Sequence, residues 1–314
     1  METRAIGSLE ASVIGLGCNN FGGRIDQAAT DGVVHAALDA GITCFDTADV
    51  YGGTKSEEFL SRALGSRRDE VLIATKFGAP IDGERKGGGS AAYVLGACED
   101  SLRRLGTDRI DLYQIHFPDA NTPLEETLRA LDELVRAGKV RAIGCSNFTP
   151  ELIEASDRIS AEQHEAPFAS VQNEYSLLRR GPEKNGVLAA CKQYGLAFIP
   201  YFPLASGMLT GKYQRDQPPP PGTRLAGMPA DRQKDAFAAK NFDRVEALER
   251  WASDHGHSLL DLAFAWLLAR STVASVIAGA TKPEQVRANA SAANWKLTAG
   301  DEAEIDAVIE GVKS

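Results

Sequence analysis

Short runs of β-forming residues alternate with helical patterns along this chain of 314 residues. Several of the runs are almost continuously apolar, as is typical of parallel strands in a sheet covered on both faces. Eight runs predict strands, at residues 13–17, 42–46, 71–76, 110–116, 140–144, 169–172, 196–201 and 273–277. Eight strand–helix units of about 39 residues each favour one (β/α)8 barrel over residues 1–314, rather than two domains.

The segments between these runs carry signals for helix starts and stops. Residues 91–105 have apolar side chains at helical spacing and are followed by a glycine, which predicts a helix over that range. Thr122 begins a capping-box pattern with a proline in the first turn, and Gly138 is expected to end that helix. Thr281 begins the same capping pattern directly after the eighth run.

An open, doubly wound sheet is the structural alternative to the barrel. Such a sheet usually has a Gly-x-Gly-x-x-Gly fingerprint after its first strand. Residues 15–20 read Gly-Leu-Gly-Cys-Asn-Asn, so the fingerprint is absent, and the chain has no P-loop sequence either.

Composition and charge exclude several classes of function. The chain has 34 basic and 43 acidic residues, a net charge of −9, and no basic tract, so it is a poor candidate for binding nucleic acid or an anionic membrane. No apolar run reaches the roughly 18–20 residues of a membrane helix. Its five cysteines are widely spread and form no C-x-x-C motif, which favours a reducing cytoplasm over a disulfide framework or a metal site.

Four titratable residues follow the ends of successive predicted strands: Asp46, Tyr51, Lys76 and His116. In a barrel these positions share the face that carries active sites. Lys76 beside Tyr51 is expected to lower the pKa of the tyrosine, and Asp46 to keep the lysine charged. Tyr51 could then give a proton to a substrate oxygen while His116 hydrogen-bonds to the same oxygen, an arrangement that suits carbonyl reduction by a hydride-donating cofactor.

Each of these four residues has an ordinary structural explanation when taken alone. Asp46 could cap a turn, Tyr51 could pack half-buried, and Lys76 and His116 could be structural. The functional interpretation therefore depends on all four residues meeting at the strand ends.

Two segments lack a regular pattern, and both follow predicted strand ends. Residues 83–89 are rich in glycine and predict a flexible loop, and a proline run at 217–222 lies in an insertion over about 205–240. Both are therefore expected to border the site.

Several segments resemble the aldo-keto reductase family, in the branch that includes bacterial reductases and potassium-channel β subunits. The first reads Phe-Asp-Thr-Ala-Asp-Val-Tyr-Gly, and the second Ile-Ala-Thr-Lys-Phe-Gly. The similar segments lie in order along nearly the whole chain, at residues 45–52, 73–78, 111–116, 144–148, 171–175, 203–213 and 279–289.

The resemblance implies an α/β fold, a single-domain TIM barrel with an N-terminal β-hairpin and long loops at its C-terminal face. It also implies that NADPH or NADP+ lies across that face, with Tyr51, Asp46, Lys76 and His116 as the catalytic tetrad and Tyr51 as the acid. Ser146, Asn147 and Gln172 would hold the carboxamide, and Tyr201 would stack on the nicotinamide. The other cofactor-binding residues it implies are Pro203, Leu204, Ser206, Gly207, Lys212, Arg224, Gly279, Thr281, Lys282, Gln285 and Asn289.

The phosphate end of this cofactor site can also be considered from the residues. Thr281 as a helix N-cap would leave free backbone N–H groups for an anion, with the charge of Lys282 nearby. Lys212 and Arg224, before and after the proline run, could clamp a pyrophosphate.

The chain departs from some aldo-keto reductases at two positions of this segment. Gly279 and Gln285 stand where those proteins have a lysine and an arginine, so Gln285 and Asn289 are expected on the adenine or ribose side. NADPH stays the expected cofactor, and NADH is less expected.

The leading functional hypothesis is an NADPH-dependent reductase of small aldehydes or ketones, reversible toward alcohol oxidation. The alternative is a redox-sensing regulatory subunit that binds the cofactor with little turnover. A barrel hydrolase is disfavoured because Asp46 and Asp49 have no second acidic cluster. No metal is expected, and a homo-oligomer is allowed.

Overall fold

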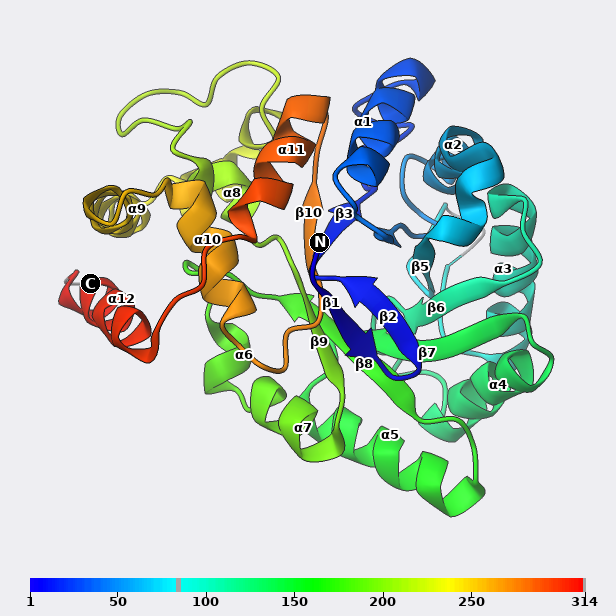
Figure 1. The fold of residues 1–314 in the computed structure, drawn as a ribbon. Coiled ribbons are helices and arrows are strands. Elements are labelled where there is room, and N and C mark those ends of the chain that lie inside the picture. Colours follow the sequence, from blue (N-terminus) through cyan, green and yellow to red (C-terminus); the bar gives the residue numbers. More distant parts are fainter. Residues whose placement is uncertain (83–85, 313–314) are drawn as a thin grey trace.

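A computed structural model describes residues 1–82 and 86–312, so the expected loop at 83–89 lies partly outside the described residues. Eight parallel strands form a closed barrel in the order β10-β3-β4-β5-β6-β7-β8-β9 (Figure 1). This confirms the predicted fold, and a barrel strand lies at or overlaps each of the eight predicted runs, although the last, β10, begins three residues later than predicted. The barrel strands are β3 (Ile14–Gly17), β4 (Cys44–Asp46), β5 (Leu72–Phe77), β6 (Ile110–Ile115), β7 (Val140–Ser146), β8 (Phe168–Glu174), β9 (Ala197–Tyr201) and β10 (Val276–Gly279).

Helices surround the barrel, as the alternation of patterns predicts (Figure 1). Short 3₁₀ segments also occur at residues 65–70, 205–210 and 225–227. The α-helices are α1 (Gln27–Asp39), α2 (Lys55–Leu64), α3 (Ala91–Leu105), α4 (Leu124–Arg136), α5 (Pro150–Gln163), α6 (Gly181–Lys184), α7 (Val187–Tyr194), α8 (Ala230–Ala236), α9 (Ala239–Asp254), α10 (Leu259–Leu268), α11 (Pro283–Ala292) and α12 (Ala299–Gly311).

The N-terminal hairpin closes one end of the barrel. Strands β1 (Thr3–Ile6) and β2 (Leu9–Ser12) pair antiparallel and lie across the barrel in Figure 1. Ile6 and Leu9, at the turn of the hairpin, are buried in a cluster with Leu72, Leu112 and other inward-facing strand residues. Because this cluster fills the N-terminal half of the barrel, only the opposite end, where the strands finish, is open to a ligand.

Two predicted helix caps are wrong. Helix α4 begins after Pro123 without a side-chain cap, because proline, which has no side-chain acceptor, holds the N-cap position and Thr122 lies one residue before it. The hydroxyl of Thr122 donates to Asp119 Oδ2 at 2.7 Å. Helix α11 has Lys282 at its N-cap position, also without a side-chain cap, because Thr281 is bonded to Gln285. By contrast, α3 covers the predicted range and ends at Gly106 in a left-handed conformation.

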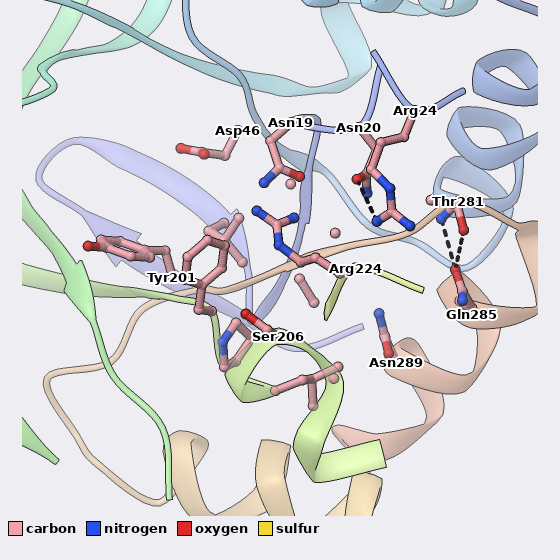
Figure 2. Close-up of a pocket in the computed structure, with 18 of the residues that line it drawn as sticks. Asn19, Asn20, Arg24, Asp46, Tyr201, Ser206, Arg224, Thr281, Gln285 and Asn289 are labelled. Atoms are coloured by element: carbon pink, nitrogen blue, oxygen red, sulfur yellow. Dashed lines mark hydrogen bonds between the residues drawn. The ribbon is translucent and has the colours of Figure 1, made fainter. Parts of the chain in front are cut away.

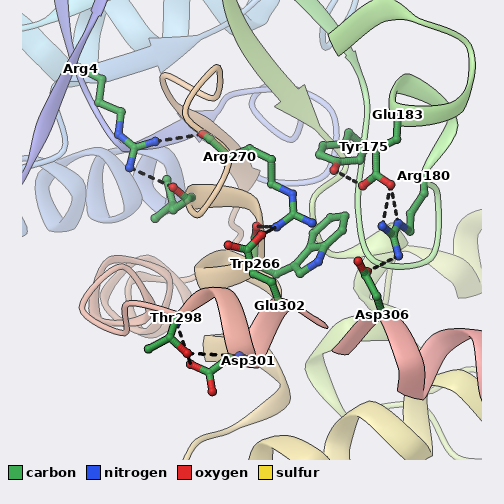
Figure 3. A network of polar contacts seen from close by, with 11 residues as sticks. Arg4, Tyr175, Arg180, Glu183, Trp266, Arg270, Thr298, Asp301, Glu302 and Asp306 are labelled. Carbon is green, nitrogen blue, oxygen red and sulfur yellow. Dashed lines mark hydrogen bonds and ion pairs between the residues drawn. The ribbon is translucent and has the colours of Figure 1, made fainter. Parts of the chain in front are cut away.

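Two arginines, one of them stacked on a tryptophan ring, form ion pairs with the C-terminal helix α12 (Figure 3). Arg270 lies over the ring of Trp266, 4.1 Å from its centroid, and donates to Glu302 of α12 at 2.6 Å. Arg180 donates to Asp306 of the same helix at 2.7 Å. These pairs hold α12 against the elements that surround the barrel. Within the described residues, no helix is both long and apolar enough to span a membrane.

Candidate active site

A cavity of about 810 Å³ lies at the C-terminal ends of the barrel strands (Figure 2). It extends from Asp46 and Tyr201 at one end to Thr281, Gln285 and Asn289 at the other, where α11 begins. With one exception, all the residues that the sequence assigned to the site line this cavity. The exception is Lys76, which is fully buried behind it.

Lys76 forms the buried centre of the polar cluster. Its ammonium Nζ lies 2.6 Å from Asp46 Oδ1 and 2.9 Å from the carbonyl oxygen of Thr47. Burial, the largest effect, lowers the pKa of Lys76, but the charges of Asp46 and Tyr51 and the hydrogen bonds to them together raise it above its usual value. The expectation that Asp46 keeps the lysine charged is therefore confirmed. The second Asp46 oxygen accepts a hydrogen bond from Gln172 Nε2 at 2.8 Å.

Tyr51 lies beside this ion pair, with its ring centroid 5.2 Å from Lys76 Nζ. The expectation that its pKa is lowered is wrong, because burial raises the pKa of Tyr51 by more than the charge of Lys76 lowers it. Burial disfavours a phenolate, so the hydroxyl keeps its proton. Such a group suits the role of a proton donor better than that of a base.

His116 completes the cluster, with its ring edge-on to Tyr51 at a centroid distance of 5.8 Å. Burial and then the charge of Lys76 lower the pKa of His116 to about 3. Its imidazole is therefore neutral near pH 7 and can donate a single N–H hydrogen bond. Phe117 stacks on the outer face of this ring at 4.8 Å and is 48% exposed at the rim of the cavity.

Because His116 is buried and neutral, we expect it to lower the stability of the protein at acid pH. In the unfolded chain its pKa returns to about 6.5, so between about pH 6.5 and pH 3 the unfolded state binds a proton that the folded state does not. Relative to a His116→Gln variant, we therefore expect the free energy of unfolding of the wild type to decrease by about 1.4 kcal/mol for each unit by which the pH falls within this window. Urea denaturation of both proteins at several pH values measures the difference, and parallel curves for the two proteins would contradict it.

Four residues at or near the ends of β7 to β9 form a connected group on the next part of the wall. Ser146 Oγ donates to the carbonyl oxygen of Gln172 at 2.8 Å, and Tyr201 donates to Asn147 Oδ1, also at 2.8 Å. Asn147 has a φ of +61° and donates to the carbonyl oxygen of His116 at 3.0 Å. These bonds hold the Asn147 amide and the Tyr201 ring in fixed positions beside His116.

Unpaired cations line the middle of the cavity. Burial, followed by the charge of Arg24, lowers the pKa of both Lys212 and Arg224. Among the described residues, neither has a carboxylate partner, and Arg224 Nε is buried without a hydrogen-bond partner. The Arg224 guanidinium stacks on the Phe202 ring at 4.6 Å and points into the cavity in Figure 2. Clustered cations without counter-charges form a site for an anionic ligand.

Arg24 belongs to this cluster but is not among the residues that the sequence assigned to the cofactor. It lies in the loop after β3, lines the cavity, and donates to the carbonyl oxygen of Gly222 at 2.7 Å. This bond joins the loop to the end of the proline run, across the cavity. Because the two segments are about 200 residues apart, no local pattern in the sequence connects them.

The structure accounts for the glycine at position 279. A Cβ there would lie 3.2 Å from both Asn19 Oδ1 and Asn20 Nδ2, so a lysine would push against the two amides. At the same end, Gln285 Oε1 accepts hydrogen bonds from Thr281 N at 2.8 Å and Thr281 Oγ1 at 3.2 Å. Thr281 therefore donates to the side chain of Gln285 in the first turn of α11 and does not cap the backbone of that helix.

Gly52 fixes the loop that carries Tyr51. It has a φ of +60°, and a Cβ there would overlap the carbonyl oxygen of Phe21. The neighbouring Gly53 has a φ of +63° but nothing within 4 Å of a Cβ, so it is a matched control. We expect Gly53→Ala to cost about 1–2 kcal/mol of stability for the left-handed conformation alone. Gly52→Ala should cost about 1–3 kcal/mol more, because the backbone must move.

Chemical denaturation of the two glycine variants measures this difference. Equal losses of stability in the two variants would show that the contact with Phe21 does not hold the loop.

The sequence was compared with known proteins. A family model described as the aldo/keto reductase family matches residues 13–310. The chain is 35% identical to the aldo-keto reductase YhdN of Bacillus subtilis (strain 168), over 98% of this chain and 92% of that protein. It is 34% identical to the L-glyceraldehyde 3-phosphate reductase of Escherichia coli (strain K12), over 88% of this chain and 82% of that protein. It is also 32% identical to a probable voltage-gated potassium channel subunit beta of Oryza sativa subsp. japonica, over 87% and 84% of the two chains.

Proposed function

Because the chain belongs to the aldo/keto reductase family, we propose that it reduces aldehydes and ketones to alcohols, reversibly, with NADPH as the electron donor. One observation carries the proposal. A buried Lys76–Asp46 pair, the protonated Tyr51 and the neutral His116 meet at one end of a cavity large enough for a cofactor and a small substrate.

Each residue of this cluster has a distinct part in protonating a carbonyl oxygen. Tyr51 gives its proton to the oxygen as negative charge develops there. The Lys76 ammonium stabilises the phenolate that is left, and Asp46 keeps that ammonium charged. His116 donates a hydrogen bond to the same oxygen and adds no charge of its own, so it orients the substrate without competing as an acid.

NADPH, when bound, supplies the hydride. The residues present fit this group, since the unpaired cations Lys212 and Arg224 match a pyrophosphate and the orphaned Arg224 Nε gains an acceptor. Asn147, Ser146 and Gln172 would hold the carboxamide, with Tyr201 against the ring. Lys282 would lie near the 2′-phosphate, and this added charge is the reason for preferring NADPH to NADH.

The similarity to a probable potassium channel β subunit favours a second candidate, a regulatory subunit that binds the cofactor but turns over slowly. The complete tetrad argues for catalysis, because a protein that only bound the cofactor would not need Tyr51 and His116 at the substrate end. Tight cofactor binding with no turnover on any carbonyl would favour the regulatory function.

Titration of the purified protein with NADPH and with NADH, followed by quenching of tryptophan fluorescence, tests the cofactor. We expect NADPH to bind more tightly, and a Lys282→Ala variant to lose affinity for NADPH but not for NADH. Equal affinities for the two cofactors would contradict the assignment of Lys282. A protein that binds neither cofactor would overturn the proposed function.

A further inference from the structure

Asp49 is a buried carboxyl group that the proposed reaction does not use. It lies in the loop between β4 and α2, three residues after Asp46 and two before Tyr51, and is only 1% exposed. Its backbone N–H donates to the carbonyl oxygen of Lys76 at 3.0 Å, which places it directly behind the catalytic cluster. Among the described residues, no side chain donates a hydrogen bond to either buried oxygen of Asp49. The backbone amide of the neighbouring Val50 lowers the pKa of Asp49, but by less than burial raises it.

The cations near Asp49 are already paired with other carboxylates. Lys76 is bound to Asp46 at 2.6 Å. On the other side, Arg104 Nε donates to Glu57 Oε2 at 2.6 Å, and Glu57, itself fully buried, also accepts a hydrogen bond from Thr75 Oγ1. Two cations therefore face three carboxyl groups in a region closed to solvent.

A proton on Asp49 resolves this imbalance. With Asp49 neutral, the charges of Asp46, Glu57, Lys76 and Arg104 sum to zero. With Asp49 ionised, one buried negative charge has no counter-ion of its own and, among the described residues, no side-chain hydrogen-bond donor, which is a costly state. Consistent with this, burial and then the charge of Glu57 raise the pKa of Asp49 to about 7.

We propose that Asp49 holds a proton in the active protein and is a positioning residue for Lys76, so that loss of this proton slows carbonyl reduction. An ionised Asp49 adds a negative charge behind the ammonium and weakens the field that Lys76 exerts on Tyr51. The phenolate left by proton transfer then becomes less stable, and Tyr51 becomes a weaker acid. The charged and titratable groups around Asp49 are Lys76 on β5, Tyr113 on β6, Glu57 on α2 and Arg104 on α3.

The inference rests on the proposed function for its kinetic consequence, which the pH dependence of kcat tests. If ionisation of Asp49 shifts the pKa of Tyr51 by about one unit, kcat of the wild type should fall roughly threefold to tenfold between pH 6 and pH 8.5. In the Asp49→Asn variant, whose amide keeps the shape of the protonated acid, this fall should disappear. Asp108→Asn, at an exposed carboxylate, is the control and should keep the wild-type profile. A fall of the same size in Asp49→Asn would overturn the proposal.

Two measurements test whether Asp49 holds a proton, and neither requires turnover: an infrared spectrum and the pH dependence of the free energy of unfolding. Infrared spectra of protein with 13C-labelled aspartate should show a protonated carboxyl band at pH 6 that is lost at alkaline pH. Its absence from the folded wild type would overturn the proposal, even if the variant fails to fold. Unfolded Asp49 loses its proton near pH 3.8, but the folded chain keeps it to about pH 7, so this group should lower stability as the pH rises through that window.

The free energy of unfolding of Asp49→Asn, measured by urea denaturation over the same pH range, should not show that decrease. These readouts also separate the two proposals. If the protein shows the carboxyl band but reduces no carbonyl, the assignment of a proton to Asp49 stands. The proposed function, and with it the kinetic role of Asp49, would then be wrong.

Discussion

Replacing Tyr51 by phenylalanine should lower kcat for carbonyl reduction by about 10²–10⁴-fold, the usual range for loss of a general acid. The substitution removes only the hydroxyl, so the ring still fills its place beside Lys76 and His116. Because the cations in the middle of the cavity are unchanged, the affinity for NADPH should stay within a few-fold of the wild type. Steady-state kinetics with a small aldehyde, together with a fluorescence titration of the cofactor, measure both quantities.

A Tyr194→Phe variant is the control for this experiment, since it removes the same atom from the end of α7, away from the cavity. It should behave as the wild type in both assays. Full activity in Tyr51→Phe would show that the proton comes from another group, and His116 would then be the first residue to examine.

Replacing Lys76 by methionine should have the largest effect on stability. The substitution leaves the Asp46 carboxylate buried with, among the described residues, only the amide of Gln172 as a side-chain donor. Breaking a buried ion pair from one side typically costs about 3–5 kcal/mol, because an uncompensated charge remains. Urea denaturation should therefore show a loss of this size, and carbonyl reduction should be lost as well.

The cost of the orphaned charge can be isolated with a double variant. Lys76→Met combined with Asp46→Asn removes both charges, so its loss of stability should be smaller than the sum of the two single losses by about 0.5–3 kcal/mol. Strict additivity, or a Lys76→Met variant as stable as the wild type, would contradict the description of the pair as a buried, mutually dependent unit.

The barrel could be predicted from the sequence because its signals are local and repeated. Parallel strands covered on both faces are mostly apolar, and β5 and β6 are buried at every position. Helix α3 was placed correctly because Gly106 adopts the left-handed conformation that its sequence position indicates. The location of the site follows from the same periodicity, since polar residues at strand ends must meet at one face.

The wrong cap predictions depend on a difference of one residue. Both helices begin one residue later than the threonines predict, with Pro123 and Lys282 at the N-cap positions. The hydroxyls of Thr122 and Thr281 donate instead to Asp119 and Gln285. The direction of the Tyr51 pKa shift depends on how deeply the ring is buried, which the spacing of residues does not reveal. The positions of Arg24 and Asp49 likewise depend on contacts between distant elements, made only in the folded chain.

The central claim is that this cavity couples oxidation of NADPH to reduction of a carbonyl group. The most direct measurement mixes the purified protein with NADPH and a small aldehyde, and follows the loss of the reduced nicotinamide and the appearance of the alcohol in the same sample. We predict equal molar amounts of both, at a rate proportional to the concentration of protein and lost in Tyr51→Phe. Loss of NADPH without formation of alcohol, or no reaction with any aldehyde or ketone while NADPH is tightly bound, would contradict the claim.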